Sequence, residues 1–162
     1  MQYATVQDMT DRYGEPEMTQ LTDPDNLVVN AARVERMLGD AQAYADASVG
    51  RVYRLPLAGC TKPASMPGAV PEQVCPPQLT RIVCDVARYY LYDDLAPEHE
   101  VYLRYKAAEK ELQAIAKGDA VLACPWGGAP GALVANDPLA DGEVYHQFSP
   151  RRITDDSMRG FA

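Results

Sequence analysis

The chain has 162 residues, of which 47% are hydrophobic and 23% are charged, and its formal net charge is −8. This length suits one domain with its own hydrophobic core. The acidic balance argues against sequence-independent DNA binding, which needs lysine and arginine side chains to displace counterions from phosphates. We expect neither a signal peptide nor a membrane span, because residues 1–13 contain charges and no run of about 18 apolar residues occurs. We therefore expect a cytosolic protein with reduced thiols.

The first 25 residues predict two short helices and a turn. Residues 5–13 form the first helix, with Thr5 at the N-cap, Asp8 in the capping-box position and Gly14 at the end. A second short helical turn follows over residues 14–21, where Pro16 suits the first helical position. The sequence Thr-Asp-Pro-Asp at 22–25 is typical of a turn.

A long helix is predicted from about Leu27 to about Val49, with Asn26 or Asp25 as its cap. Apolar residues recur in it at spacings of three and four and so form one face. They are Leu27, Val28, Ala31, Val34, Leu38, Ala41 and Ala45.

Residues 56–77 contain six prolines, which exclude a helix. Irregular loops of about 20 residues are uncommon inside compact domains and usually have a function. We expect an exposed loop here, available for contact with a neighbouring molecule.

Two further helices are predicted, one from just after Pro77 to near Asp94 and one from about Pro97 to Lys117. The second carries apolar residues at heptad spacing over two repeats, which suits packing into a bundle. These are Val101, Tyr105, Ala108, Leu112 and Ile115. The sequence therefore predicts an all-α fold. A bundle of about four main helices occupies residues 1–118, with a long proline-rich loop over 56–77, and an extended, irregular C-terminal arm occupies 119–162.

The C-terminal arm combines turn-forming residues with apolar and arginine side chains near its end. Disordered tails of ordinary composition lack such anchors, so we interpret the end as a docking segment, with a frayed terminus as the alternative. Its arginines would form hydrogen bonds with carboxylates of a partner. The candidate docking residues are Phe148, Arg151, Arg152, Ile153, Met158, Arg159 and Phe161.

The sequence contains no nucleotide-binding, esterase or metalloprotease motif. Four cysteines form no C-x-x-C pair, and His99 and His146 are far apart, so neither a metal site nor a cofactor is predicted. Cys84 is expected to be a small, part-buried packing residue. The ten tyrosines could stack on bases or lie at helix–helix and subunit contacts, and the acidic residues among them favour the contacts.

Several short segments occur in an ordered pattern along the chain. They are MQYATVQDMTDRYGE at 1–15, Leu21-Thr22-Asp23, Asp40-Ala41 leading to RVYRLPL at 51–57, Pro77-x-Leu79, CDVARYYL at 84–91, Arg104-Tyr105-Lys106-x-Ala108, Leu112-x-x-Ile115-Ala116-x-Gly118, Phe148-Ser149-x-Arg151 and Met158-x-Gly160-Phe161. Together they resemble the head–tail adaptor, or connector, family of Mu-like phages and prophages. In the family's Arg-Tyr-x-Leu-Pro-Leu motif, Val52 here separates the arginine from the tyrosine.

The resemblance implies a structural protein of the virion neck at the portal vertex of the capsid, assembled in the host cytoplasm. Such adaptors form a ring, usually of about twelve subunits, between the portal and the next neck or tail protein. They extend the channel through which genomic DNA passes without sequence-specific binding. We therefore expect no enzyme, no catalytic residue and no membrane contact.

Two other classes of function remain open. A helical regulatory or nucleic-acid-binding module would require a basic face on one helix. A small hydrolase or metal-dependent enzyme, with its site in the proline-rich loop, would lose its activity when His99 or His146 is replaced.

Overall fold

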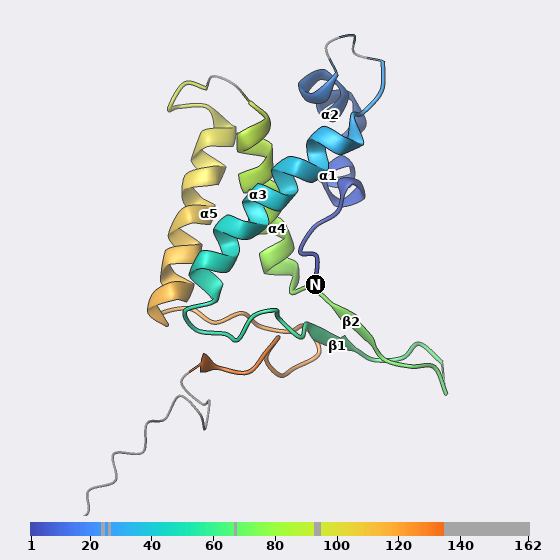
Figure 1. Cartoon of the computed structure of the whole chain (residues 1–162), viewed down its shortest axis with the longest axis vertical. Coiled ribbons are helices and arrows are strands. Elements are labelled where there is room, and N and C mark those ends of the chain that lie inside the picture. The colour runs from blue at the N-terminus through green and yellow to red at the C-terminus, as the bar shows by residue number, and fades with distance from the viewer. Residues whose placement is uncertain (24, 26, 67, 93–94, 135–162) are drawn as a thin grey trace, which may run out of the picture.

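The computed structural model describes residues 1–134, except 24, 26, 67, 93 and 94. Within this part the chain forms five helices and a two-stranded sheet (Figure 1). The mostly helical fold predicted from the sequence is confirmed. Among these helices, none has both the length and the apolar character needed to cross a bilayer. In chain order the elements are α1 (Val6–Tyr13), α2 (Glu15–Thr22), α3 (Ala31–Val49), β1 (Cys60–Lys62), β2 (Glu72–Val74), α4 (Pro77–Leu91) and α5 (Glu100–Lys117).

Helix α1 begins as the sequence predicts. The Thr5 side chain accepts a hydrogen bond from the Asp8 backbone N–H, and the Asp8 carboxylate accepts one from the Thr5 N–H. This reciprocal pair satisfies backbone donors that the first turn of a helix leaves open. Gly14, with a φ of +88°, ends α1 and begins α2.

Helix α3 begins four residues later than predicted, at Ala31, with Asn30 as its N-cap. Leu27 and Val28, expected on its buried face, are 78% and 67% exposed. Their backbone N–H groups donate to the Asp23 carboxylate at 3.0 and 3.2 Å, which holds Leu27 and Val28 close to Asp23 and outside the helix. The Asn30 side chain then accepts from the Arg33 N–H and starts the helix.

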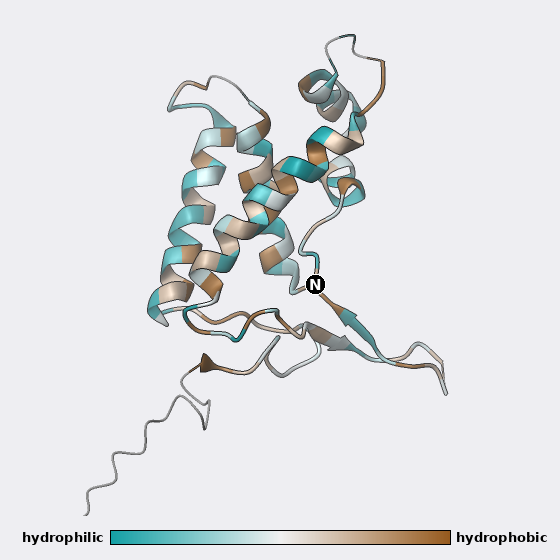
Figure 2. Ribbon diagram, in the orientation of Figure 1, coloured by the Kyte–Doolittle hydropathy of each residue, from teal (hydrophilic) through white to brown (hydrophobic). Residues whose placement is uncertain are grey.

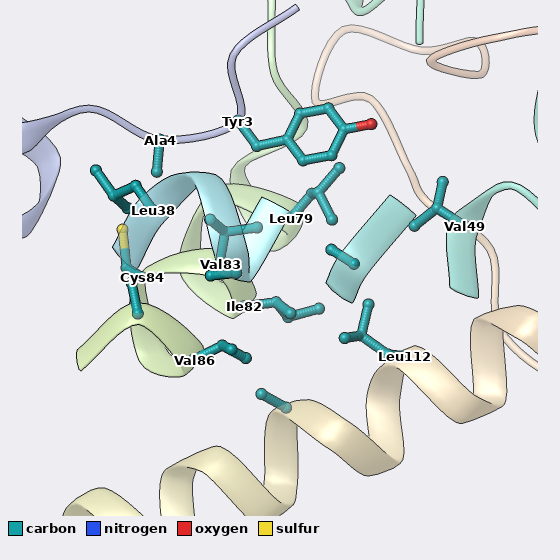
Figure 3. Close-up of a cluster of buried hydrophobic side chains, with 14 of the residues drawn as sticks. Tyr3, Ala4, Leu38, Val49, Leu79, Ile82, Val83, Cys84, Val86 and Leu112 are labelled. Atoms are coloured by element: carbon teal, nitrogen blue, oxygen red, sulfur yellow. The ribbon is translucent and has the colours of Figure 1, made fainter. Parts of the chain in front are cut away.

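The core lies where α3, α4 and α5 pack together (Figure 1). The buried residues of α3 and the predicted heptad positions of α5 face α4, and Tyr105 is the one heptad position that is only half-buried. Figure 3 shows Leu38 of α3 beside Cys84 of α4, and Ile82 of α4 near Leu112 of α5, on the side of the cluster where Val49 of α3 lies. Cys84 is a packing residue of this core, as predicted, but it is fully and not partly buried, and burial raises the pKa of its thiol to about 12.

The proline-rich segment is a β-hairpin and not the wholly irregular loop that we predicted. Strands β1 and β2 pair antiparallel, with Cys60 opposite Val74 and Lys62 opposite Glu72. Pro63 follows β1 and Pro71 precedes β2, positions at which proline does not remove a hydrogen bond of the ladder. The prolines therefore exclude a helix, as expected, and still permit a short sheet. Pro77, expected just before the next helix, is the first residue of α4.

Residues 119–134 run back below the helices and lie against residues 52–60. The backbone N–H groups of Arg54 and Gly59 donate to the carbonyl groups of Ala132 and Pro130, at 2.9 and 2.8 Å. Leu122 is buried beside this contact, and a disulfide joins Cys60 to Cys124. The expectation that all thiols stay reduced is corrected here. The two cysteines lie 64 residues apart in sequence, and only the return of the chain brings their Cα atoms to 5.3 Å.

Candidate interaction surfaces

The docking residues predicted from the sequence lie outside the residues that the structure describes. They are Phe148, Arg151, Arg152, Ile153, Met158, Arg159 and Phe161. Candidate interaction surfaces are therefore sought among the motif residues and the exposed side chains of residues 1–134.

The polar residues of the motif at 84–91 join α4 to α1 and α2. Arg88 donates to both carboxylate oxygens of Glu17, at 2.7 and 2.9 Å, and its guanidinium lies 4.4 Å from the centre of the Tyr13 ring. The Tyr13 hydroxyl donates to Asp85 at 2.9 Å, and Asp85 is only 5% exposed. Burial and the Asp85 carboxylate raise the pKa of Tyr13 well above its usual value. These residues stabilise the fold.

The tyrosines of two other motif segments are also buried. The Tyr53 hydroxyl accepts a hydrogen bond from the Leu122 N–H at 3.0 Å and so joins the end of α3 to the returning chain. The Tyr3 hydroxyl donates to the Asp46 carboxylate on α3, and burial together with this carboxylate raises the pKa of Tyr3. These motif residues thus hold the helices together.

His99, one of the two histidines considered for catalysis, begins α5. Its Nδ1 atom accepts a hydrogen bond from the Val101 N–H at 3.2 Å, which is the role of an N-cap side chain. His146 lies outside the described residues. Residues 1–134, with the five gaps given above, contain no group of three potential metal-ligating side chains.

The β-hairpin is the first exposed surface. It projects from the helical part, and its tip carries hydrophobic residues (Figure 2). Met66 and Val70 in this tip are 72% and 88% exposed and border a shallow hollow of about 420 Å³. At the end of the strands nearest the tip, an ion pair between Lys62 and Glu72, at 3.6 Å, links β1 to β2. Contiguous apolar patches are typical of protein contact sites, so we treat the tip as a candidate contact surface.

The turn between α2 and α3 is the second exposed surface and lies at the other end of the described molecule (Figures 1 and 2). It presents Leu27 and Val28, and the Asp23 carboxylate fixes its shape. The backbone N–H groups of Leu27 and Val28 lower the pKa of Asp23, because they stabilise its ionised form. Asp23 therefore positions two apolar side chains that the core does not use.

The third surface, called here the tyrosine face, consists of Tyr44, Tyr89, Tyr90, Tyr102 and Tyr105, all half-buried, from α3, α4 and α5. The rings of Tyr89 and Tyr105 stack across the contact of α4 and α5, with centroids 4.2 Å apart. Burial and the neighbouring Tyr105 raise the pKa of Tyr44 to about 12. These rings lie at helix–helix contacts, as the sequence analysis favoured.

An open depression of about 500 Å³ adjoins the tyrosine face. It is lined by Tyr89, Tyr90 and Tyr92 of α4 and its C-terminal end, and by the exposed Asp40 of α3. Asp40 and Tyr90 lie together in this lining, and burial, Tyr105 and the Asp40 charge raise the pKa of Tyr90. The depression thus combines aromatic rings with one exposed carboxylate.

Residues 3–132 match the model of the protein family described as Bacteriophage Mu, Gp36. The chain belongs to this family. The match includes all five helices and the hairpin, and it ends before the predicted docking residues of the arm. No curated protein matches the chain. Membership of the Gp36 family confirms the Mu-like phage part of the resemblance and indicates a phage structural or assembly-related protein.

Proposed function

We propose that this Gp36-family chain is a head–tail adaptor. Its copies form a ring, of about twelve subunits, between the portal protein and the next neck or tail protein of the virion. The ring extends the channel for genomic DNA and does not bind a specific sequence. In this proposal the chain assembles in the host cytoplasm, ends up in the neck of the particle, and works without catalysis or a cofactor.

The observation that carries the proposal is the position of the two apolar loops. Met66 and Val70 on the hairpin and Leu27 and Val28 on the α2–α3 turn are exposed at opposite ends of one helical core. An adaptor must bind one protein above and a different protein below, so it needs two unlike contact surfaces on a stiff body. The packed core of α3, α4 and α5 supplies that body.

The net charge of −8 and the ion pairs of five of the twelve lysine and arginine residues in the described part favour this function over a nucleic-acid-binding module. Ion pairs with carboxylates engage Lys62, Arg81, Arg88, Arg104 and Lys106. Their charge is thereby largely neutralised within the subunit. A module that grips phosphates would instead present a face of unpaired basic side chains.

The test is a measurement of mass by light scattering, on the purified full chain alone and then with the portal protein of the same phage. We expect a complex of the portal with about a dozen copies of the 17.8-kDa chain. A chain that stays a monomer and leaves the portal mass unchanged would contradict the adaptor function. A portal from an unrelated phage is the control for non-specific binding.

A further inference from the structure

We propose that the tyrosine face of one subunit is the docking site for the C-terminal arm of its neighbour in the ring. The docking segment is Phe-Ser-Pro-Arg-Arg-Ile, residues 148–153 of the same chain. This inference rests on the proposed function, since it names the contact that would join the subunits of the adaptor ring.

The tyrosine face has the chemistry that an arginine-rich, aromatic segment needs. Tyr89 and Tyr105 stack at 4.2 Å, and Tyr90 and Tyr102 lie 6.1 and 6.0 Å from Tyr89 between ring centroids. Stacked rings held between packed helices present a stiff apolar surface with polar edges. Tyrosine and arginine are the residues most often found at the energetic centres of protein interfaces.

The chain already places cations on tyrosine rings at two points, one of them within the tyrosine face. The Arg88 guanidinium lies 4.4 Å from the Tyr13 ring centre, and the Lys106 ammonium lies 5.6 Å from that of Tyr105. A guanidinium above an aromatic ring is attracted to the negative face of the ring. Arg151 and Arg152 would form the same contacts on the exposed parts of the tyrosine face.

Charge complementarity indicates that Asp40 is the ionic partner of Arg151 or Arg152. Among the described residues, Glu109 and Glu17 are also near these rings, and they are already paired with Lys106 and Arg88. Asp40 is exposed, lines the depression beside Tyr89 and Tyr90, and forms no ion pair with the described residues. A guanidinium that enters the depression can therefore stack on a ring and pair with this carboxylate.

The length of chain before the segment allows it to reach another subunit. The fourteen residues from Val134 to Phe148 can span at most about 50 Å, whereas α5 is about 27 Å long. A ring built by rotation requires each subunit to offer one patch to a different patch of the next. The arm and the tyrosine face are two such unlike, complementary patches on one chain.

A charge swap in the full chain tests the pairing. Asp40→Arg alone, or Arg151→Glu with Arg152→Glu, should weaken self-association, measured by light scattering over a range of concentrations, by about tenfold or more. The combination of all three changes in one chain should restore it. Circular dichroism should show unchanged helix content in every variant, since Asp40 is exposed. Failure of the combined variant to regain association would overturn the pairing.

A complementing mixture shows whether the arm binds a neighbour or its own subunit. One chain carries Arg151→Ala and Arg152→Ala and keeps an intact face, and the other carries Asp40→Arg and keeps an intact arm. Neither should associate alone, and their mixture should stop at a heterodimer of twice 17.8 kDa, because only one junction can form. A mixture that stays monomeric, or a wild-type chain that is monomeric at its highest soluble concentration, would overturn the inference. If the portal still binds a ring of wild-type chains in that case, only the inference about the arm fails, and the adaptor function is still supported.

Discussion

Arg88 donates two hydrogen bonds to the carboxylate of Glu17, 71 residues earlier in the chain, and thereby joins α4 to α2. The side chains are 12% and 25% exposed, so water screens this pair less than the ion pairs at the surface. The planar guanidinium also covers the Tyr13 ring. One arginine therefore fixes the positions of the two short N-terminal helices on the core.

Replacing Arg88 with lysine should destabilise the protein by about 1–2 kcal/mol, because an ammonium group cannot form the two-point contact or lie flat on Tyr13. Urea unfolding followed by circular dichroism measures the change. Arg104→Lys is the matched control, since Arg104 pairs with Glu100 at the surface, and it should cost less than about 0.5 kcal/mol. Equal losses for the two variants would show that the Glu17 contact has no special role.

Removing the Tyr53 hydroxyl should cost about 1–3 kcal/mol, because Tyr53→Phe leaves the Leu122 N–H buried without an acceptor. Faster hydrogen exchange at Leu122 should accompany the loss of stability. The control is Tyr102→Phe, since the Tyr102 hydroxyl is half-exposed and hydrogen-bonds to none of the described residues. A Tyr53→Phe variant as stable as this control would contradict the assignment.

Local sequence signals predicted the helices, but they could not predict contacts between residues that are far apart in the sequence. Thr5 with Asp8, the heptad residues of α5 and Gly118 after it each act over a few residues, and each prediction is confirmed. The start of α3 was predicted wrongly because Leu27 and Val28 continue its apolar spacing. The Asp23 carboxylate accepts hydrogen bonds from the backbone N–H groups of these two residues and so keeps them out of the helix. The spacing of apolar residues does not reveal this contact.

The surfaces proposed for contact were only partly visible in the sequence. The exposed proline-rich segment was predicted, but the strand pairing of Cys60 with Val74 was not, and the disulfide to Cys124 depends on the return of residues 119–134. The tyrosines were recognised as contact residues, yet their gathering with Asp40 required the packing of α3 against α4. The predicted arm residues lie outside the described part, so their docking stays a prediction.

Loss of the Cys60–Cys124 disulfide should destabilise the protein by about 3–4 kcal/mol, because the bond closes a long loop in the unfolded chain. A reducing agent should lower the urea midpoint of the wild type and leave that of a Cys60→Ala, Cys124→Ala variant unchanged. Cys75→Ala, which removes a half-buried free thiol, is the control and should remain sensitive to reduction. Alkylation of the unfolded, unreduced chain should modify Cys75 and Cys84 only.

Stability should decrease as the pH rises above about 9–10, and buried tyrosines should cause part of the loss. Burial and the Asp85 carboxylate raise the pKa of Tyr13 in the folded chain, so only the unfolded chain loses this proton near pH 10. The stabilisation is thus complete below the unfolded pKa and decreases above it, by up to about 1.4 kcal/mol per pH unit. Urea midpoints across this range measure the slope.

Tyr13→Phe should make that slope shallower, since phenylalanine does not titrate. Tyr102→Phe is again the control and should keep the wild-type slope. A Tyr13→Phe slope equal to that of the wild type would mean that other groups, such as the buried Cys84 thiol with its pKa of about 12, cause the whole effect.

The hairpin tip should bind one neck partner and the α2–α3 turn the other. Met66→Asp with Val70→Asp should leave the fold and the urea midpoint unchanged, because these side chains are 72% and 88% exposed. The same change should weaken binding to either the portal or the downstream neck or tail protein at least about tenfold, through the loss of apolar contact area. Light scattering of the mixtures measures this loss.

Leu27→Asp with Val28→Asp should weaken binding to the partner that the hairpin does not bind. Binding to the partner of the hairpin should stay unchanged. Ser65→Asp is the control for the hairpin, since it adds a charge to the same exposed tip without removing an apolar side chain. Because the two loops lie at opposite ends of a stiff helical core, a substitution in one loop should not alter the shape of the other. Two loop variants that both bind each partner as the wild type does would therefore remove the basis for the adaptor function.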